Sequence, residues 1–296
     1  MILAPLRGVT VRCFRESFSE ALDEYGFTEA VTPFITANAG VDPLKDRELR
    51  GVSQGGGALK ITPQFIGKDP AALKCCLARV KDAGFGTADL NCGCPFPMVR
   101  NKFRGSGILK TRDVFEKMIA TGCEVMGDGA FSVKVRLGIE KGDEFLSLIS
   151  IVNSYPLRFV TVHARTAKQM YEGECDIGAF RAVADAVKVP LVYNGDAFLE
   201  SGGIRGPRGA EDLSKFNLHD VMIGRGFVRY LASRDDIGEL IGLYIDSSVK
   251  ELGSPRPVLG RMKELLAYWK DFPCWSGVWK SAKMAKTLDE LKMCLA

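Results

Sequence analysis

The alternation of short apolar segments with amphipathic segments is the feature that most limits the fold of this chain. Eight apolar segments of strand length recur before residue 231 of the 296-residue chain, and seven segments with helical periodicity lie between them. Eight strands alternating with helices over about 230 residues predict a (β/α)8 barrel, also called a TIM barrel. A doubly wound sheet is the alternative, but no strand-to-helix turn carries its G-x-G-x-x-G fingerprint. The expected strands are Ile2–Pro5, Ala30–Ile35, Thr62–Ile66, Thr87–Asn91, Phe131–Arg136, Phe159–His163, Leu191–Asn194 and Val221–Ile223, and the expected helices are 12–24, 41–49, 69–83, 112–125, 143–153, 178–187 and 208–216.

The pattern changes near Tyr230, beyond which no strand is expected. Segments with helical periodicity continue over about 234–252, 257–270 and 276–295, and Gly253-Ser254-Pro255 and Phe272-Pro273 separate them. We therefore expect a barrel over residues 1–231 and a small helical domain over residues 232–296.

The net charge of the chain is concentrated in this C-terminal part. Residues 256–296 hold eight Lys and Arg against four acids, which accounts for the whole net charge of +4, and they also hold all three tryptophans. Basic residues interleaved with aromatic residues are typical of a nucleic-acid surface. The alternative is a helical domain with a core of Trp and Leu and a solvated Lys/Arg face.

Other features restrict the cellular setting. No apolar run approaches the roughly 18–20 residues that span a membrane. The beginning of the chain has no basic segment before its apolar residues, which is unlike a signal peptide. Nine cysteines without regular spacing are typical of reduced thiols, so we expect a cytoplasmic protein. Cys92 and Cys94 could ligate zinc, but His163 and His219 lie far away in the sequence, and we expect no metal.

The stretch Ala88-Asp-Leu-Asn-Cys-Gly-Cys-Pro95 places a thiol where a strand ends and a loop begins. Its first half is apolar and small, whereas Pro95 and Pro97 lack the N–H group that a sheet requires. In parallel α/β folds, ligands bind at this end of the strands. The sequence therefore predicts chemistry at the cysteine pair.

Polar and glycine residues also follow most of the other expected strands. Asn194-Gly195-Asp196 and Gly224-Arg225-Gly226 follow the seventh and eighth strands, where barrels often bind a phosphate. Lys134 and Gln64 would face a ring system deeper in the barrel mouth. Flavin mononucleotide (FMN) fits this pattern.

These segments resemble the tRNA-dihydrouridine synthases, and most of all the bacterial C-type branch of that family. The resemblance rests on Ala4-Pro-Leu-Arg-Gly-Val-Thr, Asp89-Leu-Asn-Cys-Gly-Cys-Pro, Lys134-Val-Arg, His163-Ala-Arg-Thr, Asn194-Gly-Asp and Gly224-Arg-Gly, in the family's order, over about residues 2–230. It implies an FMN enzyme that uses NADPH to reduce the C5–C6 double bond of particular uridines in tRNA, with hydride arriving at C6. The expected assembly is a monomer that binds tRNA, without a membrane.

The resemblance also assigns residues. Cys94 matches the catalytic acid that protonates C5, and Asn91 matches a residue near the target base. We expect further tRNA contacts from Arg100, Lys102 and Arg104 in the basic, glycine-containing loop after Cys94, and from Arg136 and Arg165. The positions that match flavin-binding residues are Pro5, Leu6, Arg7, Gln64, Lys134, His163, Asn194, Gly195, Asp196, Gly224 and Arg225.

Three alternatives stay open at this point. The first is an FMN barrel that acts on a free pyrimidine, as dihydroorotate dehydrogenases do, and the second is a tRNA-binding protein without catalysis. The third is an aldolase-type barrel in which Lys134 forms a Schiff base. The Gly105-Ser-Gly-Ile-Leu-Lys run is shorter than the family's glycine loop, and the C-terminal domain is compact. These two departures from the family's pattern bear on which uridine of the tRNA is modified.

Overall fold

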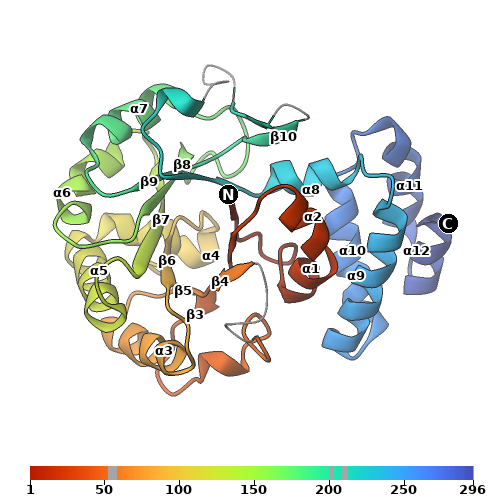
Figure 1. Ribbon diagram of the computed structural model, residues 1–296, viewed down its shortest axis with the longest axis horizontal. Helices are drawn as coiled ribbons and strands as arrows, with labels where there is room; N and C mark the ends of the chain where they lie inside the picture. Colours follow the sequence, from red (N-terminus) through yellow and green to blue (C-terminus); the bar gives the residue numbers. More distant parts are fainter. Residues whose placement is uncertain (53–58, 201–202, 208–212, 296) are drawn as a thin grey trace.

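A computed structural model describes residues 1–52, 59–200, 203–207 and 213–295. Figure 1 shows a curled parallel sheet surrounded by helices, with a group of C-terminal helices packed on one side. The strand order of this sheet is β3-β5-β6-β7-β8-β9-β12-β1-β2-β4. Its strands are β1 (Ile2–Leu3), β2 (Glu29–Val31), β3 (Ile35–Thr36), β4 (Lys60–Thr62), β5 (Gln64–Ile66), β6 (Ala88–Cys92), β7 (Phe131–Gly138), β8 (Val160–Thr166), β9 (Leu191–Asn194) and β12 (Asp220–Ile223).

The two ends of this order meet, so the sheet is a closed barrel of eight extended segments. β2 and β3 belong to one segment that Pro33 interrupts, and β4 and β5 belong to another that Pro63 interrupts. β2 pairs with β4 and β3 pairs with β5, all in parallel. Between these pairs, Thr32 N donates to Thr62 O at 3.0 Å and Gln64 N donates to Thr32 Oγ1 at 3.1 Å. Each proline removes a donor from the ladder but leaves its segment extended, so the pairing continues on both sides of it. The predicted barrel is confirmed.

Most of the expected barrel helices form, and two of them begin with a side-chain cap. Asp69 accepts a hydrogen bond from Ala71 N at the start of α3, and Asp176 accepts one from Ala179 N at the start of α7. Figure 1 places α3, α5, α6 and α7 around the outside of the sheet. The barrel helices are α1 (Arg12–Ser17), α2 (Ser19–Glu24), α3 (Pro70–Asp82), α5 (Arg112–Met126), α6 (Ile149–Val152), α7 (Ile177–Ala186) and α8 (Arg225–Leu231).

Several expected elements differ. Over 41–49 only the 3-10 turn η1 (Pro43–Lys45) forms, because Asp42 and Asp46 accept bonds from the backbone two residues on and so stabilise turns instead of a helix. Over 143–153 the chain forms the 3-10 helix η3 (Glu144–Leu148) and then α6. In the expected helix 208–216, residues 208–212 lie outside the described residues, and the 3-10 turn η4 (Leu213–Lys215) follows them. The antiparallel strands β10 (Phe198–Glu200) and β11 (Gly203–Arg205) were not expected.

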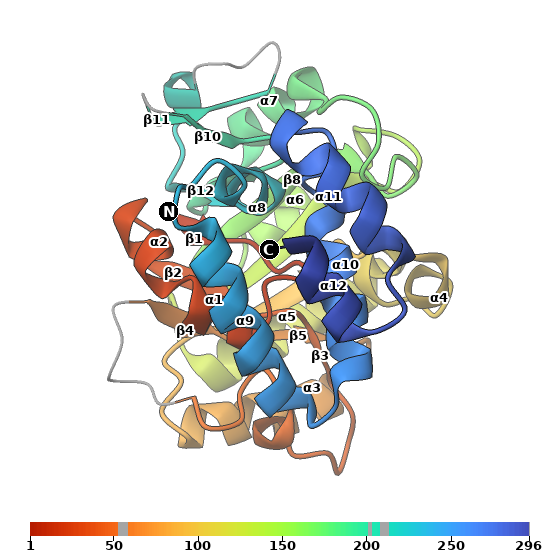
Figure 2. The ribbon, with the colours of Figure 1, turned by 90° about the vertical axis from the view of Figure 1, so that its right-hand side faces the viewer.

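The C-terminal region, defined here as residues 232–295, consists of helices, as expected. They are α9 (Ile237–Leu252), α10 (Pro255–Ala267), α11 (Pro273–Met284) and α12 (Leu288–Leu295), so the expected segment 276–295 divides into two helices. Tyr244 of α9 packs against Phe14 and Phe18 of the barrel, with ring centroids 5.7 and 5.6 Å apart. Figure 2 shows these helices stacked along one face of the molecule.

The aromatic and the basic residues of this region separate. Trp269 is fully buried and donates its indole N–H to Val228 O at 2.6 Å, and Trp275 donates to Ala232 O at 2.9 Å. Trp269 therefore packs on the barrel helix α8 and Trp275 on the residue that follows it, as in the alternative of a Trp/Leu core. The exposed basic residues of the region are Lys250, Arg256, Lys270, Lys280, Lys283, Lys286 and Lys292.

The described residues contain neither a membrane-spanning helix nor a cluster of metal ligands. None of their helices has both the length and the apolar character needed to cross a membrane. Within the same ranges, no three His, Cys, Asp or Glu side chains gather as metal ligands.

Candidate active site

A cavity of about 670 Å³ opens at the carboxyl ends of the barrel strands. Its volume lies within the roughly 300–1,000 Å³ of small-molecule sites. Residues within or directly after β1, β6, β7, β8, β9 and β12 line it, and so do Tyr268 and Lys270, which follow α10. The C-terminal region therefore forms part of the cavity wall.

The two cysteines of the central motif have different environments. β6 alternates, so that Leu90 and Cys92 pack into the hydrophobic core, while Asp89 and Asn91 hydrogen-bond to other barrel-interior side chains. The strand ends at Cys92, and Cys94 therefore does not continue its alternation. Cys94 lines the cavity and Cys92 does not.

Cys94 is held from both sides by hydrogen bonds. Asn91 Oδ1 accepts the backbone N–H of Gly93 at 3.1 Å and that of Cys94 at 2.8 Å. Ser106 donates its backbone N–H and its hydroxyl to Cys94 O, at 3.0 and 2.9 Å. Gly105 has a φ of +56°, and a Cβ at this position would lie 2.7 Å from Cys94 Cβ. This glycine therefore allows the loop to close on the cysteine.

The thiol of Cys94 stays protonated at neutral pH. It is 7% exposed, and burial raises its pKa above the ordinary value of 9.0, although Arg136 and Arg7 oppose the rise. Burial therefore outweighs the nearby cations. The result is a proton donor in the wall of the cavity.

A chain of hydrogen bonds in the barrel interior leads to Asn91. The Asp89 carboxylate accepts from Ser132 Oγ at 2.7 Å and from Gln64 Nε2 at 2.8 Å. Gln64 Oε1 then accepts from Asn91 Nδ2 at 2.8 Å. Because the Asp89 carboxylate accepts, Gln64 turns its amide nitrogen toward Asp89 and its oxygen toward Asn91. Asn91 then turns its nitrogen toward Gln64 and its oxygen toward the backbone N–H of Cys94. Burial raises the pKa of Asp89 to about 7.

Lys134 forms the cationic part of the same interior. Its Nζ donates to Asn194 Oδ1 at 2.8 Å, and Asn194 Nδ2 donates to Met222 O at 2.8 Å. Burial and the charge of Arg136 lower the pKa of Lys134 to about 7, against the attraction of Asp89. Among the described residues Asn194 is its one hydrogen-bond partner, which leaves two of the three ammonium N–H groups for a ligand.

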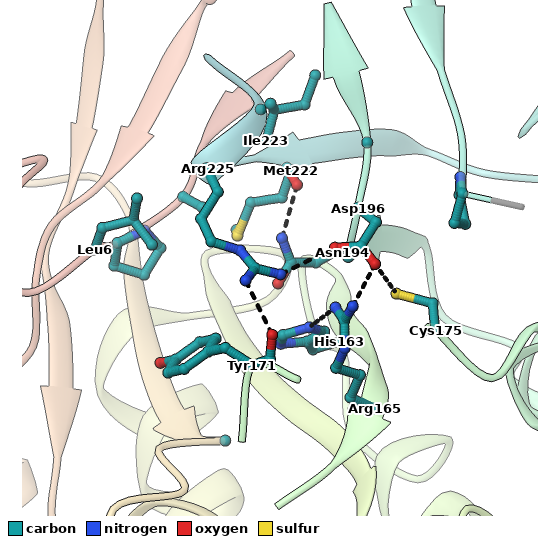
Figure 3. A pocket seen from close by; sticks show the side chains of 18 of the residues that line it. Leu6, His163, Arg165, Tyr171, Cys175, Asn194, Asp196, Met222, Ile223 and Arg225 are labelled. Atoms are coloured by element: carbon teal, nitrogen blue, oxygen red, sulfur yellow. Dashed lines mark hydrogen bonds and ion pairs between the residues drawn. The ribbon is translucent and has the colours of Figure 1, made fainter. Parts of the chain in front are cut away.

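Asp196 joins two arginines across the cavity (Figure 3). Its carboxylate pairs with Arg165 and, at 2.9 Å, with Arg225. Arg165 Nη1 also donates to His163 Nε2 at 3.3 Å. Burial and the surrounding cations hold the pKa of His163 well below its ordinary value. His163 is therefore neutral, and its Nε2 accepts.

Tyr171 forms an aromatic wall next to this cluster. The guanidinium groups of Arg136 and Arg225 lie over its ring, 5.1 and 5.6 Å from the centroid. Arg136 also donates to Gly93 O at 2.9 Å and to Thr166 O at 2.8 Å. Arg136 thus ties the Cys94 loop to the end of β8.

Positive charge dominates the cavity. Of the described residues that line it, eight are Lys or Arg and three are Asp or Glu. An excess of fixed positive charge attracts an anionic ligand such as a phosphate. Gly195, with a φ of +127°, lets the turn after β9 pass close to the side chain of Cys175, which a Cβ would approach to 2.7 Å.

The structure brings most of the expected site residues together. Gln64 is fully buried beneath the cavity and reaches it through Asn91. Arg136 and Arg165 were expected to contact tRNA, but each is only 2% exposed, and both bond within the cavity wall. The expected residues that line the cavity are Pro5, Leu6, Arg7, Asn91, Cys94, Lys134, Arg136, His163, Arg165, Asn194, Gly195, Asp196, Gly224 and Arg225.

The basic residues after Cys94 lie outside the cavity. Arg100 ends the short helix α4 (Pro97–Arg100), and Lys102 and Arg104 follow it, whereas none of the three lines the cavity. In Figure 2, α4 stands at the edge of the molecule. Gly105 of this glycine-containing loop is buried against Cys94.

Sequence reasoning gave no role to Tyr171, Asp89 or Tyr268. Tyr171 lies in a loop without periodicity, and Tyr268 reaches the cavity from the C-terminal region. Of these three residues, only Asp89 could have been noticed in the sequence, because it is a carboxylate within a buried strand.

The sequence is similar to a known enzyme family and to several of its members. A family model described as dihydrouridine synthase (Dus) matches residues 2–230. The tRNA-dihydrouridine synthase B of Vibrio vulnificus is 28% identical over 227 residues, which is 76% of this chain and 66% of the relative. That of Pectobacterium carotovorum is 25% identical over 97% of this chain and 84% of the relative. The tRNA-dihydrouridine(16) synthase of Shigella flexneri is 28% identical over 66% of this chain and 64% of the relative.

The alignment with the Vibrio protein thus spans slightly less than two thirds of that relative. Among solved structures, morphinone reductase in complex with tetrahydroNAD superposes with a TM-score of 0.51 at 12% identity, covering 77% of this chain and 83% of that one. The old yellow enzyme homologue of Zymomonas mobilis gives 0.51 at 12%, with 77% and 85% covered. At these identities the likeness concerns the fold.

Proposed function

The chain belongs to the dihydrouridine synthase family, and from this premise we propose that it reduces the C5–C6 double bond of uridines in tRNA. The observation that carries the proposal is the protonated thiol of Cys94, fixed by Asn91 in the wall of a cation-lined cavity. Reduction of a carbon–carbon double bond needs a hydride and a proton, and this thiol is a suitable source of the proton.

The cavity fits FMN as the cofactor. Eight lining cations suit a phosphate, and the turns after β9 and β12 lie where barrels bind one. Gly195, Gly224 and Arg225 would hold the phosphate. Lys134 would contact the ring, and the buried amide of Gln64 would act on it only through Asn91. Pro5, Leu6, Arg7, His163, Asn194 and Asp196 complete the expected set. When bound, FMN supplies the hydride, which the uridine receives at C6, and NADPH is the proposed source of those electrons.

Cys94 would complete the addition. A proton moves from its Sγ to C5 of the uracil ring, so that C5 and C6 each gain one hydrogen and the thiol becomes a thiolate. Water then returns a proton to the thiolate. Arg136 and Arg7 stabilise that thiolate by their charge, which limits the cost of the step.

Folded tRNA must turn the target uridine out of its stack before the base can enter the cavity. We assign the grip on tRNA to Arg100, Lys102 and Arg104 and to the exposed basic residues of the C-terminal region, which we treat as a domain over 232–296. Arg136 and Arg165 would instead shape the pocket that receives the base. The proposed setting is the cytoplasm, where a monomer meets unmodified tRNA.

The test is a flavin-coupled turnover. The purified protein should carry a yellow flavin that NADPH bleaches without oxygen, and unmodified tRNA should then restore the colour and gain dihydrouridine. Restoration by a free pyrimidine but not by tRNA would favour the dihydroorotate-dehydrogenase-like alternative. A colourless protein that binds tRNA would favour the non-catalytic one, and covalent trapping of a substrate on Lys134 by borohydride would favour the aldolase type.

A further inference from the structure

Exposed apolar side chains follow closely after Cys94 in the sequence. Three such side chains come from residues 96–103: Phe96 is 42% exposed, Met98 75% and Phe103 45%. Tyr171 is 40% exposed, and its ring centroid lies 6.4 Å from that of Phe96. Among described residues, the other exposed large apolar side chains, Val41, Leu243, Met284 and Met293, lie in separate elements. We call Phe96, Met98 and Phe103 the mouth patch.

The backbone of the mouth patch supports a functional reading. Three non-glycine residues in the described part of the chain have positive φ: Phe103 (56°), Met170 (53°) and Asp196 (34°). Asp196 lines the cavity, Met170 O accepts from Arg136, and Phe103 belongs to the mouth patch. Such conformations are strained and occur mainly where function requires them. At Phe103 the strain presents a half-exposed aromatic ring instead of burying it.

The charge of the segment indicates what covers the patch. Residues 96–104 contain Arg100, Lys102 and Arg104 and no acid, and Lys68 lies over the Phe103 ring at 5.6 Å. Aromatic and apolar side chains interleaved with cations suit nucleotides, whose bases stack while their phosphates pair. The patch is continuous with the cavity, because Phe96 also lines it.

We propose that the mouth patch is a wedge that contacts the bases flanking the target uridine and replaces their lost stacking while that uridine occupies the cavity. Apolar wedges perform this role in proteins that unstack nucleic acid. The inference rests on the proposed function, since it deepens the account of the same site. It assigns the apolar residues to unstacking and the neighbouring cations to phosphate binding.

The test compares two tRNAs in single-turnover reoxidation of the NADPH-reduced enzyme. The wild-type enzyme first identifies the uridine that it converts, and if it converts none, the proposed function fails and not the wedge alone. Two transcripts are then used, one intact and one with an abasic nucleotide beside that uridine, so that less stacking must be broken. The variants are Met98→Ser and Phe103→Ser, and the control is Leu243→Ser, an exposed apolar residue of α9.

We expect Met98→Ser and Phe103→Ser to slow reoxidation by the intact tRNA about tenfold, the size of a lost base stack. The abasic tRNA should restore most of that rate, the salt dependence of tRNA binding should be unchanged, and Leu243→Ser should behave as wild type on both. Equal losses on the two tRNAs, or no loss on either, would overturn the wedge. A wild-type dimer that Met98→Ser converts to monomer would overturn it as well, by assigning the patch to a second copy of the chain.

Discussion

Asn91 Oδ1 accepts the backbone N–H of Cys94 at 2.8 Å, and this one contact links the interior of the barrel to the proposed proton donor. Asn91 is itself fixed by Gln64, which Asp89 orients. The thiol is therefore positioned by three side chains from two adjacent strands, β5 and β6.

Uridine reduction should fall as the pH rises past the pKa of Cys94. The proton donor is lost when the thiol ionises, and because burial raises that pKa, the midpoint of the decline should lie above the ordinary thiol value of 9.0. Single-turnover flavin oxidation by tRNA, measured from pH 6 to 10.5 with FMN held at saturation, gives the profile. A decline centred near pH 7 would contradict a protonated Cys94, and flavin reduction by NADPH is the control for enzyme integrity.

Asp89→Asn should remove a pH dependence of stability. The folded-state pKa of Asp89 is raised from 3.8 to about 7, so the folded protein binds more protons than the unfolded chain between these values. Its contribution to stability is full below the unfolded pKa and is lost as pH rises through about 7. From pH 5 to pH 8 the wild type should lose on the order of 2–3 kcal/mol relative to Asp89→Asn, measured by urea unfolding. If the difference in free energy of unfolding between the wild type and Asp89→Asn is the same at pH 5 and pH 8, the raised pKa of Asp89 is refuted.

Gly105→Ala should impair both stability and catalysis. The new Cβ would lie 2.7 Å from Cys94 Cβ on a backbone with a φ of +56°. We expect a loss of about 2 kcal/mol or more, and a kcat for uridine reduction reduced about tenfold. Gly127→Ala is the matched control, because its φ is +97° with no atom within 4 Å. It should cost about 1–2 kcal/mol without a change in kcat.

Lys134→Met should weaken flavin binding at least tenfold, or about 1.4 kcal/mol. The substitution removes the buried cation that bonds Asn194. Because the pKa of Lys134 is about 7, the affinity of the wild type should fall as pH rises from 6 to 9, and the variant should lose this dependence. Equilibrium dialysis against FMN measures both effects. If Lys134→Met binds FMN with the affinity and the pH dependence of the wild type, Lys134 does not contact the flavin ring.

The barrel was predictable because each strand carries its own apolar run and each connecting helix its own periodicity. The helix expected at 41–49 failed where Asp42 and Asp46 bond to nearby backbone N–H groups, which is a local choice that periodicity does not record. The hairpin of β10 and β11 lies in a long loop between strands, where short pairings leave little pattern.

The site was predictable where residues follow strand ends, since the barrel brings those ends together. Lys134, Asn194 and Cys94 belong to three different strand ends and meet at one cavity. The burial of the charged side chains in the site was not predictable from the sequence. Arg136 and Arg165 resemble free RNA contacts in the sequence, but the structure bonds them to the carbonyls of Thr166 and Gly173. Tyr171 and Tyr268 reach the site through loop geometry alone.

The pKa of Cys94 could not be predicted either. Burial and nearby cations act in opposite directions, and only the packing around the thiol decides between them. The structure decides for the protonated form, which is the form that the proposed reaction requires.

The most direct test is the single-turnover oxidation of reduced flavin by unmodified tRNA in Cys94→Ala, with Cys92→Ala as the matched control. We predict that Cys94→Ala is reduced by NADPH at the wild-type rate but transfers electrons to tRNA at least about 100-fold more slowly. Cys92→Ala should lose stability, since its thiol packs in the core, but retain tRNA turnover once folded. Near-wild-type oxidation by tRNA in Cys94→Ala would contradict the role of this thiol as the proton donor.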